Sequence, residues 1–350
     1  MTNRERFLAA LNGSPQERLP MVEWADWWDK TVRRWEEEGL PKGLRNPEII
    51  AYWKLDPMLQ YWLRSAGEGC PRPKGHGLGI IEDEADYEAV RPYLYQDKSI
   101  ARMVEWTKQV KLRHDSGEAV VWNTFKGFFW FPRTLFGIEP HLYAFYDYPE
   151  LMHQINQDQC DFCIRAIHAV CQVFAPDFIT IAEDMSYNHG PMLSKALFDE
   201  FLAPYYRQVV PVLKDYGVSI LIDSDGQVDS IIPWLEACGI EGILPLEHQA
   251  GVDVERIRRE HPDWKMLGAF DKMIMHLGED AMRQEFERLL PVMRSGRFIP
   301  AVDHQTPPDV SLENYRIYAG FMRNMRGRRF SRRVEAELLR SKSKTGGPGE

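Results

Sequence analysis

Short, almost wholly apolar runs alternate with longer amphipathic stretches through the second half of the chain. The apolar runs span residues 178–182, 219–222, 242–246, 265–270 and 298–302, and the amphipathic stretches after them span 195–216, 230–238, 254–260, 280–293 and 312–325. Runs of this length without polar alternation are typical of parallel strands that are buried on both faces. Five successive strand–helix units therefore predict a parallel sheet with right-handed helical crossovers.

The first half of the chain adds further strand candidates. Residues 19–24 and 119–123 have strand-like patterns, residues 78–81 suit a strand or a hairpin, and residues 142–174 form a long helical region. A strand count near eight favours a closed barrel over an open doubly wound sheet, and no glycine-rich phosphate motif follows any strand. We predict an α/β fold, a single-domain (β/α)8 TIM barrel over residues 1–335, followed by a disordered tail at 336–350.

Composition and charge narrow the protein class. Of 350 residues, 44% are hydrophobic and 27% are charged, which is ordinary for a globular protein, and the net charge of -9 argues against a nucleic-acid partner. There is no signal-peptide pattern and no apolar run long enough to cross a membrane, so we expect a cytoplasmic protein. Cys160, Cys163 and Cys171 share one face of a predicted helix, which favours core packing over metal binding.

Acidic residues and one histidine follow the predicted strands. They are Glu183, Asp184, Asp223, Asp225, Glu247, Asp271, Asp303 and His304, with Glu23 after the first strand. The carboxyl ends of barrel strands meet at one mouth, where active sites lie. Helix capping is an alternative role for any single aspartate, but it does not easily explain Glu183, Glu247 and His304 together. The catalytic candidates are Glu183, Asp225, Glu247, Asp271 and His304.

Three kinds of chemistry fit such a mouth. Asp223, Asp225 and His304 could bind a divalent metal such as zinc. The carboxylates could instead act as general acid and base, with pKa values raised by mutual repulsion. They could also neutralise a cationic substrate beside aromatic faces.

Aromatic residues follow the first two predicted strands, at the same expected mouth. We expect substrate contacts from Glu23, Trp24, Trp27, Trp28, Phe129, Trp130 and Asp184. The alternative for the aromatic residues is packing in the core and in a lid over the barrel.

Five stretches spread over nearly the whole chain carry a family pattern. They read MTNRERFLAALNGSPQERLP, AEDMSYNHGPMLSKALFDEFLAPYYRQ, DSDGQVDSIIPWLEACGIEGILPLEHQAG, GAFDK and DHQTPPDVSLENY. In sequence and order they resemble the uroporphyrinogen decarboxylase superfamily, which includes methylcobamide:coenzyme M methyltransferases. The resemblance implies a (β/α)8 barrel, in agreement with the strand count.

The chain departs from both known patterns of that superfamily. The decarboxylases carry an arginine-rich R-Q-A-G-R-Y segment where residues 23–28 contain no arginine, although His304 matches their late histidine. The methyltransferases bind zinc through an H-x-C pair and a later cysteine. Here Asp223 and Asp225 occupy the first two positions, and the third falls near Asp303 and His304.

The resemblance implies an enzyme, and the acidic, aromatic mouth favours a corrinoid-linked methyltransferase or demethylase for a small methylated substrate. Its cofactors would be a divalent metal and a corrinoid carried by a partner protein. The alternatives are decarboxylation of uroporphyrinogen or another carboxylate, which needs no cofactor, and a non-catalytic ligand-binding barrel. We expect no membrane partner, and a homodimer is an open option.

Overall fold

A computed structural model describes residues 1–324 of the chain. Residues 325–335 of the predicted domain and the predicted tail at 336–350 lie outside this part. The main sheet is parallel, with the strand order β1-β2-β3-β6-β7-β8-β9. Its strands are β1 Met58–Trp62, β2 Val120–Lys126, β3 Phe178–Ala182, β6 Ser219–Asp223, β7 Gly242–Leu244, β8 Lys265–Phe270 and β9 Phe298–Val302; β4 Ser186–Tyr187 and β5 Gly190–Pro191 form a small antiparallel pair.

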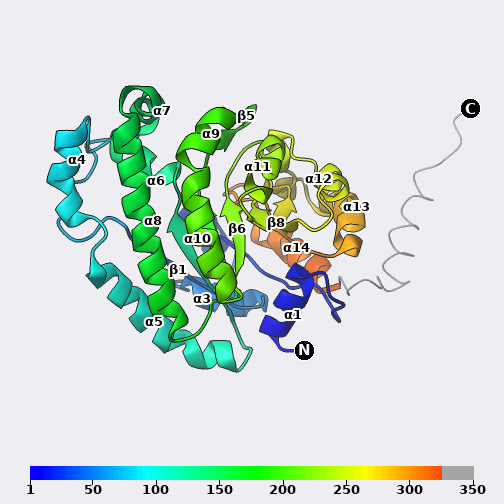
Figure 1. The fold of residues 1–350 in the computed structure, drawn as a ribbon. Helices are drawn as coiled ribbons and strands as arrows, with labels where there is room; N and C mark the ends of the chain where they lie inside the picture. The colour runs from blue at the N-terminus through cyan, green and yellow to red at the C-terminus, as the bar shows by residue number, and fades with distance from the viewer. Residues whose placement is uncertain (325–350) are drawn as a thin grey trace, which may run out of the picture.

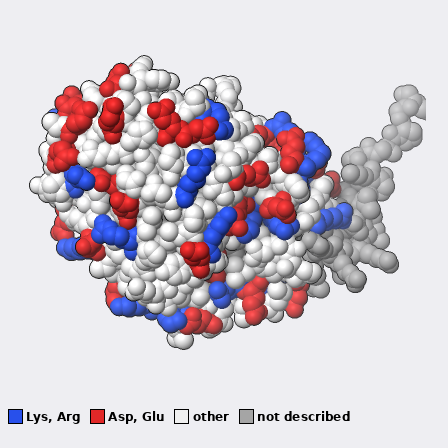
Figure 2. Space-filling view, in the orientation of Figure 1, with Lys and Arg blue, Asp and Glu red and all other residues white. Residues whose placement is uncertain are grey.

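Helices cover the outside of the curled sheet (Figure 1). The α-helices are α1 Asn3–Leu11, α2 Asp29–Glu37, α3 Asn46–Trp53, α4 Glu84–Val90, α5 Asp97–Asp115, α6 Trp130–Phe136, α7 Ile138–Asp147, α8 Pro149–Cys171, α9 Lys195–Phe201, α10 Ala203–Asp215, α11 Ile232–Glu236, α12 Val254–Glu260, α13 Glu279–Ser295 and α14 Leu312–Asn324. Short 3-10 helices are η1 Arg91–Tyr93, η2 Asp229–Ile231, η3 His248–Ala250 and η4 Lys272–Leu277. On the face in Figure 2, acidic and basic side chains are interspersed.

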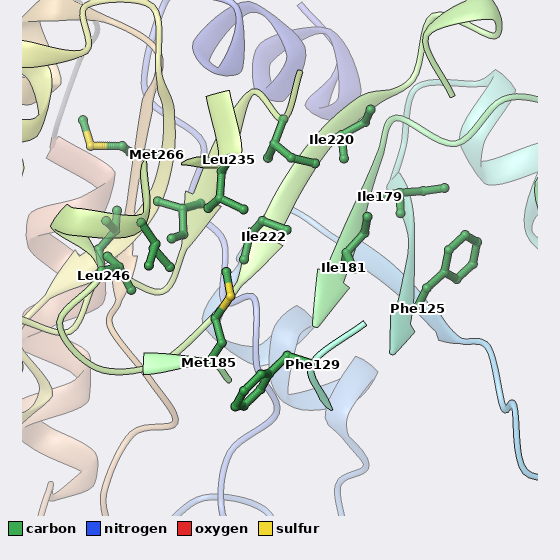
Figure 3. Close-up of a cluster of buried hydrophobic side chains, with 14 of the residues drawn as sticks. Phe125, Phe129, Ile179, Ile181, Met185, Ile220, Ile222, Leu235, Leu246 and Met266 are labelled. Carbon is green, nitrogen blue, oxygen red and sulfur yellow. The ribbon is translucent and has the colours of Figure 1, made fainter. Parts of the chain in front are cut away.

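Alternate residues of each strand build two separate layers of core. One set points outward and packs under the helices; Figure 3 shows part of this layer, including Ile179 of β3 and Ile222 of β6. The other set points into the barrel, where Trp122 stacks on Phe178 at 4.9 Å between ring centroids. Phe7 of α1 stacks on Phe178 from below at 5.5 Å, so α1 closes the end of the barrel opposite the mouth.

The segment at residues 19–24, which we predicted as the first strand, is not hydrogen-bonded as a strand. Pro20 lacks an N–H donor, which weakens any ladder at this point. The segment still contacts both edges of the sheet. The Met21 carbonyl accepts from the N–H of Asp56, just before β1, at 2.7 Å, and the Trp24 indole donates to the Val302 carbonyl of β9 at 2.9 Å. The segment thus fills the eighth place and completes a TIM-barrel fold.

The five strands predicted in the second half and the strand near residues 119–123 are confirmed. Two other expectations need correction. Residues 78–81 form only an isolated bridge, between Leu78 and Gly137, and strand β1 was not predicted because its five residues include Gln60 and follow Pro57. Cys160 and Cys163 are buried in the core, as expected. None of the helices in residues 1–324 has the length and apolar character of a membrane span.

Candidate active site

Carboxylates from neighbouring strand ends gather at the mouth of the barrel. Asp223 ends β6 and is 8% exposed, and Asp225 follows it in the loop. Asp184 follows β3 and accepts a hydrogen bond from the backbone N–H of Asp225. Burial, and then the charges of Asp184 and Asp225, raise the pKa of Asp223 well above its usual value. The three side chains therefore form one electrostatically coupled group.

Asp225 and His304 face each other across this group. Their closest atoms, Oδ2 of Asp225 and Nε2 of His304, are 3.7 Å apart, and both side chains are partly exposed. Burial and the charges of Asp184 and Glu247 raise the pKa of Asp225 to about 7. Burial and the Lys272 ammonium lower the pKa of His304. Near neutral pH about half of the Asp225 carboxyls therefore hold a proton, and the His304 imidazole is mainly neutral.

Lys272 is a cation among these carboxylates. Its Nζ is 2.7 Å from Oε1 of Glu247 and 3.6 Å from Oδ1 of Asp303, and its side chain is 11% exposed. Burial alone would raise the pKa of Glu247, but the bond from Lys272, with bonds from Gly226 and Gln249, holds that pKa below its usual value. Glu247 is therefore a fixed anion next to Asp225.

Glu183, a predicted catalytic residue, lies away from this group, fully buried under the turn that begins α6. The backbone N–H groups of Phe128, Phe129 and Trp130 donate to its carboxylate at 2.9, 2.7 and 3.2 Å. The Tyr206 hydroxyl donates a fourth bond. Burial outweighs these bonds and raises the pKa of Glu183 to about 7. With every oxygen in use, this carboxylate anchors the α6 turn to β3.

Two other predicted acidic residues also have local partners. Asp271 accepts from the N–H of Met273 at 2.8 Å and so caps η4. Glu23 accepts from the Tyr315 hydroxyl at 2.8 Å, and burial raises its pKa to about 8. Capping was the alternative that we considered for single aspartates, and Asp271 fits it.

The predicted aromatic contacts are divided between the mouth and the core. Trp24 lies edge-on to His304, with ring centroids 6.0 Å apart, and Trp130 lies edge-on to Trp62 at 5.8 Å. Trp28 is 45% exposed at the start of α2. The other two, Trp27 and Phe129, are buried, Trp27 beside Tyr315 and Phe129 beside His141.

The three predicted metal ligands were tested as a set. Within residues 1–324, no three His, Cys, Asp or Glu side chains are grouped to hold a metal ion. The Lys272 ammonium acts on both Asp225 and His304, and it would repel a cation placed between them. The described residues therefore do not fit a three-ligand metal site.

Three polar residues of these sites were missing from our sequence-based set. Lys272 directly follows Asp271 in the stretch GAFDK, and its side chain could have been recognised as the counter-ion that so many carboxylates need. Lys126 ends β2 on the same side as Val120 and Trp122, so strand alternation places it at the mouth. Tyr206 carried no such signal, because its partner Glu183 is distant in sequence.

One solved structure supports the fold. A methyltransferase from Methanosarcina mazei has a similar structure, with a TM-score of 0.62 and 17% sequence identity, and the match covers 92% of this chain and 98% of that chain. Two other matches are too dissimilar to indicate a shared fold. A β-glucosidase from Pyrococcus furiosus has a TM-score of 0.36 and 9% identity, and the match covers 97% of this chain and 93% of that chain. A Xaa-Pro dipeptidase has a TM-score of 0.33 and 13% identity, and the match covers 82% of this chain and 75% of that chain. A search of curated protein sequences found no match.

A profile of the uroporphyrinogen decarboxylase (URO-D) family matches residues 131–325. This range covers more than half of the chain and contains β3, β6, β7, β8 and β9, with the acidic residues that follow them. Four of the five sequence stretches that suggested this superfamily lie in this range, and the chain belongs to the uroporphyrinogen decarboxylase family.

Proposed function

We propose that this protein is a methyltransferase that demethylates a small methylated substrate and passes the methyl group to a corrinoid carried by a partner protein. The observation that carries the proposal is the pair of Asp225 and His304 in the carboxylate-rich mouth of a URO-D family barrel. The structural similarity to a protein named as a methyltransferase is consistent with it.

Asp225 would act as the general acid. When the bond between the methyl carbon and its heteroatom breaks, the electron pair of that bond stays on the heteroatom, which then needs a proton. A reduced corrinoid supplies the electron pair for the new bond to the methyl group. Asp225 has a pKa of about 7, so it holds a proton near neutral pH and can give it up in the same range.

The neighbouring residues would position the substrate and the acid. His304 is neutral and lies 3.7 Å from Asp225, so it can orient the carboxyl and later help to return the proton. Glu247 is held ionised by Lys272 and keeps the pKa of Asp225 high by charge repulsion. Trp24, edge-on to His304, offers an apolar wall for the methyl group.

The test is methyl transfer from a panel of O- and N-methylated donors to a reduced corrinoid protein, with the wild type and Asp225→Asn. General acid catalysis contributes roughly 10²- to 10⁴-fold, so Asp225→Asn should lower kcat by that range with little change in KM. Asp199→Asn, an exposed residue of α9 paired with Lys195, is the matched control and should keep full activity. Turnover of uroporphyrinogen instead of any methylated donor would favour a decarboxylase and refute the proposal.

A further inference from the structure

Lys126 has a place in the mouth that the proposed mechanism does not use. It is the last residue of β2, and its side chain follows Val120, Trp122 and Thr124 on the face that points into the barrel. Gln159 of α8 donates to its carbonyl at 2.7 Å and holds this strand end in place. The side chain is half-buried, and burial lowers its pKa.

Lys126 differs from the other enclosed lysines in having no carboxylate partner. Lys272 contacts Glu247 and Asp303, and Lys265 contacts Glu241. Lys126 forms no ion pair within residues 1–324. A half-buried cation without a counter-charge is unfavourable, so a lone lysine of this kind is better explained by an anionic ligand than by stability.

The half-buried Cys70 thiol, whose pKa burial raises, and two tryptophans surround this lysine. Its Nζ lies 5.7 Å from the centre of the Trp130 ring, a cation–π contact that leaves the ammonium free to bind an anion. Trp62, at the end of β1, meets Trp130 edge to face at 5.8 Å and 87°, and it is 38% exposed. Lys126, Trp62 and Trp130 therefore combine one cation with a flat apolar surface that is exposed to solvent.

The strand register relates Lys126 to the acidic group of Asp184, Asp223 and Asp225. Lys126 pairs with Ala182 of β3, and Ala182 pairs with Asp223 of β6. Neighbouring strands are about 4.8 Å apart, so the backbones of Lys126 and Asp223 are separated by roughly 10 Å. The short, buried side chain of Ala182 lies between them in the register.

We propose that Lys126, Trp62 and Trp130 form a subsite for the carboxylate and ring of a flat organic anion, whose protonatable heteroatom reaches Asp225 at the opposite side. Only the position of the ligand's reacting end, at Asp225, rests on the proposed function. The anion subsite itself depends only on Lys126 and the two tryptophans. The substrate class is then an aromatic carboxylate with a methylated heteroatom on the far side of the ring.

The experiment measures binding, without methyl transfer. The probes are 4-hydroxybenzoate and its uncharged analogue 4-hydroxybenzamide, titrated by calorimetry against the wild type, Lys126→Met and Lys214→Met. Lys214 is an exposed lysine in the last turn of α10, at the opposite end of the barrel, and it serves as the matched control. A double-mutant cycle over ligand charge and residue charge isolates the interaction of the carboxylate with Lys126.

We expect the wild type and Lys214→Met to bind the carboxylate at least tenfold more tightly than the amide, and Lys126→Met to lose this preference. Equal affinity for both probes in the wild type, no binding of either, or an unchanged preference in Lys126→Met would each overturn the subsite. A lost preference in Lys126→Met, together with no methyl transfer from any donor, would leave the subsite in place and refute the methyltransferase proposal.

Discussion

Replacing Glu183 by glutamine separates an anchoring role from a catalytic one. At pH 8, above its pKa of about 7, the carboxylate is ionised and accepts all four bonds, from three backbone N–H groups and Tyr206. Glutamine has nearly the same shape but only one acceptor oxygen. Its amide nitrogen fits best at Oε1, where the Tyr206 hydroxyl can turn to accept, although the N–H of Phe128 then faces a donor.

The expected loss of stability follows from these contacts. One buried N–H without a partner costs about 1–3 kcal/mol, and the other bonds lose the charge that strengthened them, so Glu183→Gln should cost roughly 2–4 kcal/mol. With an unfolding entropy of about 2.1 cal/mol/K per residue, this lowers the Tm by roughly 3–6 °C. Tyr206→Phe removes one donor and keeps three, so we expect a drop of only about 2 °C.

The assay is thermal unfolding at pH 8, followed by far-UV circular dichroism, with methyl transfer measured at 20 °C on the same samples. Glu183→Gln should lose stability and keep most of its kcat. A variant with an unchanged Tm and a kcat reduced by a hundredfold or more would show that Glu183 reacts with substrate, and the anchoring account would fail.

Three further predictions concern other parts of the structure. In Gly127→Ala the new Cβ would clash with Oε1 of Glu183, so the Tm should fall by several degrees. In the control Gly320→Ala the new Cβ meets open space inside α14, and the Tm should rise by about 1 °C. Equal changes in Tm for the two variants would contradict the close approach of Gly127 to Glu183. His141 is buried, and neither of its ring nitrogens has a hydrogen-bond partner in the described part of the chain. His141→Leu should therefore raise the free energy of unfolding, measured in urea, by about 1–2 kcal/mol. A lower free energy of unfolding would reveal an unrecognised partner of His141. Lys272→Met leaves two carboxylates without their cation and should cost about 3 kcal/mol at pH 8, where both are ionised. The loss should be smaller at pH 5, which is below the pKa of about 7 of Asp303, although Glu247, whose pKa Lys272 helps to lower, stays ionised in the wild type; a loss independent of pH would exclude the ion-pair explanation.

The strand pattern predicted the barrel because parallel strands need two apolar faces, and β8 and β9 begin and end at the predicted residues. The first barrel segment was harder to predict. Pro20 removes a ladder bond, so residues 19–24 take their place through contacts with Asp56 and Val302 that come from distant parts of the chain. Local propensity carries no information about such contacts.

The candidate site shows a similar division. The strand ends correctly indicated that Asp184, Asp223, Asp225, Glu247 and His304 gather at one mouth, because barrel geometry brings all strand ends together. The sequence alone could not separate these residues from Glu183. Its role depends on the path of the turn after β2, which directs three N–H groups toward one carboxylate.

In the proposed function, Asp225 donates a proton during methyl transfer at this mouth. The most direct measurement is the pH dependence of single-turnover methyl transfer to a reduced corrinoid protein, for the wild type and Asp225→Asn. Since the acid works only while protonated, the wild-type rate should be constant below its pKa of about 7 and fall tenfold per pH unit above it. Asp225→Asn should be at least a hundredfold slower, with no break near pH 7. A wild-type rate that rises through pH 7, or an Asp225→Asn variant with the wild-type profile, would contradict the account.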